Sequence, residues 1–157
     1  MKPTRKSAGI LLYRILNNPE FFLVHPGGPF WAKKDLGSWS IPKGEFDDTE
    51  DALTAAKREF KEETGTDISG NFIPLIPITQ KAGKQVYAWA VQGDIDAEAI
   101  QSNTFKMEWP PKSGQWKSYL EVDKAGWFDI KTAKEKINPA QVVLIEELLE
   151  KLNLQNL

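Results

Sequence analysis

Three glutamates, Glu59, Glu62 and Glu63, stand three and four residues apart in a segment that has the pattern of a helix. Side chains at these spacings lie on the same face of a helix. Like charges on one face repel, so the arrangement lowers stability unless a positive charge lies close by. A hard divalent cation such as Mg²⁺ supplies that charge, because it prefers carboxylate oxygens and also binds substrate phosphates. The spacing therefore predicts metal-assisted phosphate chemistry.

The residues around the glutamates indicate the limits of this helix. Asp48 or Thr49 is the predicted N-cap, and Gly65 is the predicted left-handed residue after the last turn. An apolar stripe at helical spacing is formed by Leu53, Ala56 and Phe60. At roughly 100° per residue, Glu59 and Glu63 lie beside this stripe. We therefore expect the acidic face at the edge of the hydrophobic core.

The main alternative to a metal site is a solvated acidic patch, because short runs of Lys and Glu are common on helices. A wider pattern favours the metal site. Its fixed positions are Gly44, Glu50, Arg58, Glu59, Glu62, Glu63 and Gly65. Residues 44–66 resemble the Nudix box: Gly, five residues, Glu, seven residues, Arg-Glu, an apolar residue, any residue, Glu-Glu, any residue, Gly. Such a match arises by chance roughly once in 10⁸ starts. Only Thr66 departs from the pattern, which usually has a bulky aliphatic residue there.

The resemblance to Nudix proteins implies a fold and a reaction. The expected fold class is α/β (α+β), a Nudix-type α/β/α sandwich with a mixed sheet, formed by residues 1–157 as one domain. The expected reaction is hydrolysis of a pyrophosphate bond in a nucleoside diphosphate derivative, by attack of water on phosphorus. In such enzymes Mg²⁺ or Mn²⁺ polarises the phosphate oxygens and lowers the pKa of the attacking water.

The same resemblance implies roles for the residues of the box. The expected metal ligands are Glu59, Glu62, Glu63 and the backbone carbonyl of Gly44 or its neighbour Lys43. Arg58 is expected to orient these carboxylates through charge-assisted hydrogen bonds rather than to touch the substrate. Glu50 is expected to be a structural partner. Within the box, the predicted catalytic residues are therefore Arg58, Glu62 and Glu63.

Many Nudix enzymes use a further glutamate outside the box to take a proton from water. Glu121 is the predicted catalytic base, because it follows an expected loop at residues 112–119 and precedes an aromatic strand at residues 125–130. Glu108 is the next candidate, and Asp123 follows it. The alternative is that Glu121 is an ordinary loop glutamate in contact with solvent.

Four residues are candidates for substrate contacts: Lys43, Trp31, His25 and Tyr87. Lys43 adjoins the glycine of the box and offers a cation to a phosphate. Trp31 and Tyr87 offer aromatic faces, and stacking contributes about 1–3 kcal/mol per base. His25 ends an expected strand where some Nudix relatives place a substrate-binding arginine. The alternative for the aromatic residues and for His25 is ordinary packing or hydrogen bonding.

The substrate class is narrowed only by resemblance. Residues 39–44, Trp-Ser-Ile-Pro-Lys-Gly, resemble a Trp-x-x-Pro-Lys-Gly segment of diadenosine polyphosphate hydrolases. A compact chain also suits a MutT-like enzyme, so a nucleoside triphosphate or a dinucleoside polyphosphate is favoured. A second class of function is a catalytically silent Nudix fold that acts as a nucleotide-binding regulatory module. The complete set of box carboxylates argues against this second class.

Composition excludes several other kinds of protein. The chain has 157 residues, a net charge of -2 and no cysteine. It therefore has no global basic field for a nucleic-acid polymer, and it has neither disulfides nor thiol catalysis. No apolar run approaches the length of a membrane span, and the N-terminus lacks the apolar segment of a signal peptide. We expect a cytoplasmic protein that binds a small nucleotide, with the oligomeric state left open.

The remaining pattern predicts strands before and after the acidic helix. The expected strands are residues 8–16, 21–25, 39–41, 72–79, 84–93, 103–109 and 125–130. A terminal helix is expected to begin at Pro139. Strands on both sides of a central helix, followed by a second helix, indicate a mixed sheet between helical layers.

Overall fold

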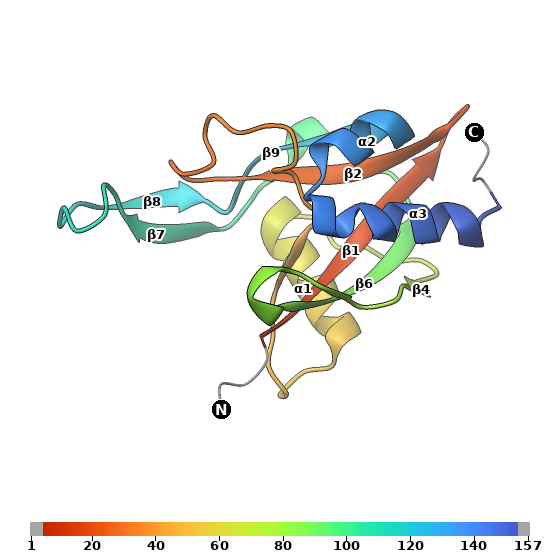
Figure 1. Ribbon diagram of the computed structural model, residues 1–157, viewed down its shortest axis with the longest axis horizontal. Helices are drawn as coiled ribbons and strands as arrows, with labels where there is room; N and C mark the ends of the chain where they lie inside the picture. The colour runs from red at the N-terminus through yellow and green to blue at the C-terminus, as the bar shows by residue number, and fades with distance from the viewer. Residues whose placement is uncertain (1–4, 154–157) are drawn as a thin grey trace.

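A mixed sheet with helices on both faces forms the body of the protein, and the computed structural model describes residues 5–153 (Figure 1). The strands are β1 (Lys6–Ile15), β2 (Pro19–Pro26), β3 (Lys43–Glu45), β4 (Ile73–Pro74), β5 (Ile78–Thr79), β6 (Gln85–Gln92), β7 (Thr104–Glu108), β8 (Trp116–Leu120) and β9 (Val122–Asp129). The α-helices are α1 (Ala52–Thr64), α2 (Ile130–Lys136) and α3 (Val142–Lys151). None of the helices within the described residues has the length and apolar character needed to cross a membrane.

Strand β1 lies at the centre of the seven-stranded sheet. It pairs in parallel with β6 and antiparallel with β2 and β3, and β2 pairs in turn with β9. Alternate side chains of a strand face opposite sides of a sheet. Ile10 and Leu12 therefore pack against α1, whereas Leu11 and Tyr13 pack in the core that holds α2 and α3. This arrangement confirms the predicted α/β/α sandwich.

The acidic helix begins later than predicted. Asp51, and neither Asp48 nor Thr49, caps α1, because its carboxylate accepts the Thr54 backbone N–H at 3.2 Å. Asp47 accepts the Thr49 N–H at 2.8 Å, and this turn keeps the preceding residues out of the helix. Gly65 ends the helix with φ of 79°, as predicted.

Several predicted elements differ from the observed ones. Residues 39–41 form no strand, since Ser40 and Trp39 make only isolated bridges, to Val24 and Ile137. The strand in this region is Lys43–Glu45. Residues 72–79 form two short strands rather than one. The expected loop at residues 112–119 contains most of β8. The strand predicted at residues 125–130 starts at Val122, and α2, which follows it, was not predicted.

Strands β7 and β8 form a hairpin that projects from the body of the molecule (Figure 1). Within residues 5–153, no third strand pairs with this hairpin. Its base connects to the sheet through residue 121, which stands between β8 and β9. The second strand of the hairpin therefore ends directly before Glu121, the predicted catalytic base.

Candidate metal and active site

Three carboxylates meet where α1 approaches the base of the hairpin. Glu59, Glu63 and Glu121 each place one oxygen within 4.8 Å of the others. Glu59 and Glu63 stand on successive turns of α1, and Glu121 comes from a chain segment about sixty residues further on. The predicted base and two of the predicted metal ligands thus lie side by side. We call this group the carboxylate cluster.

Backbone hydrogen bonds hold Glu121 in the cluster. Its N–H donates to the Asn103 carbonyl at 2.9 Å, and the Asn103 N–H donates to the Glu62 carbonyl at 2.8 Å. On the other side, the Gly27 N–H donates to the Glu121 carbonyl at 2.9 Å. A Cβ at Gly27 would lie 1.9 Å from the Leu120 carbonyl oxygen, so only glycine permits this approach. The sequence did not single out Asn103 or Gly27 as parts of the site. The adjacent glycines Gly27 and Gly28 after β2 were the one sequence feature that could have indicated a close approach of two backbones here.

Gly44 is needed for close packing rather than for a turn. A Cβ at this position would lie 2.0 Å from the Glu59 carboxyl carbon and 2.1 Å from one of its oxygens. Strand β3 can therefore pass beside α1 only where it has no side chain. This proximity places the Gly44 backbone next to the cluster, while its predicted role as a carbonyl ligand stays a prediction.

Arg58 links the box carboxylates to one another. It binds Glu50 through two nitrogens, at 2.6 and 3.2 Å, and it donates to Glu59 at 2.9 Å and to Glu62 at 3.1 Å. The pKa of Arg58 is raised, with the hydrogen bond to Glu50 as the largest cause. Such contacts suit a residue that fixes the positions of the Glu59 and Glu62 carboxylates while Glu50 holds its guanidinium group.

Glu62 lies outside the carboxylate cluster. Its carboxylate pairs with Arg58 and lines a separate hollow of about 550 Å³ with Ser102 and Asn103. The predicted ligand set was Glu59, Glu62 and Glu63, whereas the structure groups Glu121 with the other two. The assignment of Glu62 as a metal ligand stays a prediction.

Burial and mutual repulsion outweigh the nearby positive charges of Arg58 and Lys43 at the cluster. Burial, together with the charge of Glu62, raises the pKa of Glu59 to about 7. Burial and the charge of Glu59 raise the pKa of Glu63 well above its ordinary value, and burial also raises the pKa of Glu121. Three close oxygen donors short of positive charge fit a hard divalent cation. The residues present therefore suit the metal that the box implies.

The raised carboxyl pKa values predict how pH acts on the metal-free protein. Folded Glu59 keeps its proton up to a pKa of about 7, against an ordinary value of 4.5. Between these values the folded state binds more protons than the unfolded state, so the free energy of unfolding falls as pH rises. We expect Glu59 to contribute a loss on the order of 3 kcal/mol across this window.

Urea denaturation of wild type and of Glu59→Gln in chelator, at several pH values, measures this contribution. The stability difference between the two proteins should shift in favour of the variant as pH rises from about 4.5 to 7. Excess Mg²⁺ should reduce the loss in wild type, because a bound cation favours the ionised carboxylates. Parallel pH profiles for the two metal-free proteins would contradict the prediction.

An open cleft surrounds the cluster. It is lined by Pro26, Gly27, Trp31, Lys43, Gly44, Glu45, Glu59, Glu63, Phe105 and Glu121. Two predicted substrate-binding residues, Trp31 and Lys43, thus lie at the cleft. Burial, with a smaller contribution from Lys84, lowers the pKa of Lys43, so a phosphate would stabilise its charged form. Phe105 supplies a second aromatic side chain that the sequence did not single out.

The structure does not bring His25, a predicted substrate contact, to the surface of the cleft. His25 is completely buried, and it packs edge-on against Trp39. Its Nδ1 lies 2.8 Å from the Asp123 carboxylate, and its Nε2 lies 2.6 Å from the Lys34 carbonyl. The ring therefore ties the loop after β2 to β9 and has no free face for a ligand.

Tyr87, another predicted substrate contact, also lies outside the cleft lining. It lies on the α1 face of β6, packs against Phe46, and donates its hydroxyl hydrogen bond to Gln85 at 2.9 Å. It is absent from the residues that line the cleft. Contacts with Phe46 and Gln85 hold Tyr87 at a place on the α1 face outside the residues that line the cleft.

The other candidates for the base have structural partners of their own. Glu108 accepts the backbone N–H groups of Lys112 and Gly114, at 3.1 and 3.0 Å, and thereby holds the hairpin turn. Asp123 accepts from His25. Neither belongs to the carboxylate cluster. Among the three candidates, Glu121 is the one whose position suits proton transfer.

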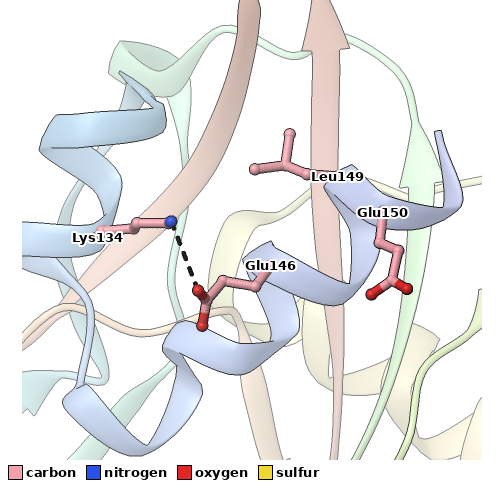
Figure 2. A pocket seen from close by; sticks show the side chains of 4 residues that line it. All are labelled: Lys134, Glu146, Leu149 and Glu150. Carbon is pink, nitrogen blue, oxygen red and sulfur yellow. Dashed lines mark ion pairs between the residues drawn. The ribbon is translucent and has the colours of Figure 1, made fainter. Parts of the chain in front are cut away.

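Another hollow lies between α2 and α3, on the side of the sheet opposite to α1 (Figure 2). It is lined by Lys134, Glu146, Leu149 and Glu150, and Lys134 pairs with Glu146 at 3.7 Å. Two carboxylates against one ammonium make this hollow unsuitable for a phosphate. The carboxylate cluster is therefore the better candidate for phosphate chemistry.

Comparison with known proteins identifies the family. A sandwich whose acidic helix carries a carboxylate cluster at an open cleft is the architecture that the resemblance predicted. The profile of the NUDIX domain matches residues 3–148 of the chain. The protein belongs to the NUDIX family.

The relatives of this chain include a phosphatase and a hydrolase. The 8-oxo-(d)GTP phosphatase of Mycolicibacterium smegmatis (strain ATCC 700084 / mc(2)155) is 28% identical over 142 residues, which is 87% of this chain. This chain spans only 38% of the length of that relative. A C. elegans Ap4A hydrolase in a binary complex matches with a TM-score of 0.61 and 23% identity, over 94% of this chain and 95% of that one.

A further solved structure is the NUDIX domain of Shewanella oneidensis NrtR complexed with ADP ribose. It matches with a TM-score of 0.67 and 17% identity, over 97% of this chain and 90% of that one. At such identities the solved structures establish the fold. Together with the family match, these relatives confirm the predicted membership of the Nudix family and its fold.

Proposed function

We propose that the protein hydrolyses a pyrophosphate bond in a nucleoside diphosphate derivative, with a nucleoside triphosphate or a dinucleoside polyphosphate as the favoured substrate. The observation that carries this proposal is the carboxylate cluster at an open cleft beside Trp31 and Lys43. The names of two relatives, an 8-oxo-(d)GTP phosphatase and an Ap4A hydrolase, support a nucleotide substrate. The expected cytoplasmic location and the single domain over residues 1–157 remain predictions.

Glu59 and Glu63 would hold a divalent cation, Mg²⁺ or Mn²⁺, with Glu62 as the further ligand that the box implies. When bound, the cation polarises phosphate oxygens and lowers the pKa of the attacking water. Arg58 keeps Glu59 and Glu62 in place through its hydrogen bonds. These hydrogen bonds would hold the metal-binding carboxylates in position before the substrate binds.

Two residues at the cleft would act on the substrate and the water. Lys43 would bind a phosphate oxygen, which restores the positive charge that burial disfavours. Glu121 would accept the proton of the attacking water, and its raised pKa improves it as a base near neutral pH. Trp31 would offer a stacking surface to the base of the nucleotide.

The competing function is nucleotide binding without turnover. The intact cluster argues against it, since a binding module has no use for a proton acceptor placed beside the metal ligands. Calorimetric titration with nucleotides and Mg²⁺, run beside a phosphate-release assay, separates the two. Binding without any release would favour the regulatory module.

The bond that breaks tests the proposed reaction. Hydrolysis of nucleoside triphosphates, dinucleoside polyphosphates and nucleotide sugars in ¹⁸O-labelled water, with Mg²⁺ or Mn²⁺, should put the label on one phosphate product. Water reaches phosphorus because the cluster would hold the phosphates against the cation. Mass spectrometry of the products measures the label. Label on a sugar hydroxyl, or release of free base, would exclude this reaction.

A further inference from the structure

The hairpin of β7 and β8 extends the candidate site away from the body of the protein. Phe105, the second residue of β7, lines the cleft. On the other strand, Glu121 directly follows β8 and belongs to the carboxylate cluster. In Figure 1 the hairpin leads outward from this point, beside the loop that follows β2. Both strands of the hairpin therefore start at the cleft.

Strand pairing defines which side chains share a face with Glu121. The register pairs Phe105 with Tyr119 and Met107 with Lys117. Paired residues lie on the same face of an antiparallel ladder, and residues two apart on one strand do so as well. The face that carries Glu121 therefore continues through these four side chains. We call Phe105, Tyr119, Met107 and Lys117 the arm face.

The composition of the arm face suits an aromatic base. The rings of Phe105 and Tyr119 lie 6.1 Å apart, and Phe105, Tyr119 and Met107 are half-buried, with part of their surface open to solvent. Lys117 is exposed and offers N–H donors to the acceptor atoms of a base. The opposite face carries the exposed Trp116 as its one aromatic residue, together with Thr104, Lys106, Glu108, Ser118 and Leu120. Only the arm face joins aromatic surface to the cluster.

We propose that the arm face binds a second base of the substrate, while Trp31 takes the first. Tyr119 lies two residues from Glu121, about 7 Å along the strand. A base stacked there stays within reach of phosphates held at the cluster. This inference rests on the proposed function, and it makes the arm a determinant of preference for substrates with a base at both ends.

Two matched probes test the arm. Diadenosine tetraphosphate and adenosine tetraphosphate carry the same number of phosphates, but only the first has a second adenosine. Tyr119→Ala should raise KM for diadenosine tetraphosphate at least about fivefold, as expected for one lost stacking contact. Its KM for adenosine tetraphosphate and its kcat for both probes should change less than about twofold. Tyr119→Phe, which keeps the ring, should behave like wild type.

Trp116→Ala is the matched control, because it removes an exposed aromatic side chain from the opposite face of the same hairpin. It should leave both KM values unchanged. An equal rise on both probes, or the same rise in Trp116→Ala, would overturn the proposal. A change in oligomeric state with unchanged KM, measured by size-exclusion chromatography, would also overturn it and assign the arm to contact with a second copy.

Binding measurements can test the role of the arm face even if the protein does not hydrolyse these probes. If wild type hydrolyses neither probe, calorimetric titration with both probes and Mg²⁺ replaces the kinetics. Weaker binding of diadenosine tetraphosphate by Tyr119→Ala, with unchanged binding of adenosine tetraphosphate, would then support the arm although turnover of these probes fails. Equal binding by variant and wild type, or no binding by wild type, would overturn it.

Discussion

Replacing Glu63 by Gln should lower turnover by at least about 100-fold and, at the same time, raise the melting temperature of the metal-free protein. Partners that only support a metal ligand cost 10–100-fold when they are lost, so a ligand itself should cost more. Glu63 is half-buried, and its pKa is raised first by loss of solvation and then by the charge of Glu59. The neutral amide removes the buried charge and keeps the shape of the side chain. Steady-state kinetics and thermal unfolding in chelator measure the two effects.

Chelation gives the control for the metal, since activity should vanish in chelator and return with Mg²⁺ or Mn²⁺. Glu62→Gln gives the control for position, because Glu62 lies outside the cluster and pairs with Arg58. A loss as large as that of Glu63→Gln would support Glu62 as a ligand, as the box implies. Near wild-type turnover in Glu63→Gln would refute the metal assignment.

Glu121→Gln should lower kcat by about 10²–10⁴-fold, the usual contribution of a positioned proton acceptor. KM should change little, because the side chain would act on water rather than on the substrate. Burial raises the pKa of Glu121, so the wild-type rate should fall on the acidic side as this carboxyl takes up its proton. In Glu121→Gln that part of the pH profile should disappear. A pH series of kcat measures both effects.

Glu108→Gln is the matched control for this variant. Glu108 holds the hairpin turn through the backbone N–H groups of Lys112 and Gly114, so its loss should affect the hairpin more than the chemical step. If Glu108→Gln lowers kcat more than Glu121→Gln does, the base is misassigned. The metal assignment would survive that result, because it depends on α1.

Local sequence was sufficient for the acidic helix. The spacing of Glu59 and Glu63 places both side chains on one face whatever the helix packs against, and Gly65 ends the helix as predicted. The box also predicted the family, the mixed sandwich and the charge-assisted hydrogen bonds of Arg58 to the box carboxylates. These features depend on contacts within about a dozen residues, or on a pattern that the family keeps.

Packing between distant segments decided the rest of the candidate site. Glu121 enters the cluster only because the backbones of Asn103 and Gly27 bind it from two sides. His25 is not available to a ligand at the site, because its two ring nitrogens are hydrogen-bonded to the Asp123 carboxylate and the Lys34 carbonyl. The pairing of β2 with β9 brings Asp123 to His25, and a shift of one residue in that register would turn these side chains to the opposite face. The sequence thus determined which carboxylates share a helix, whereas only the tertiary structure decided which other groups meet them.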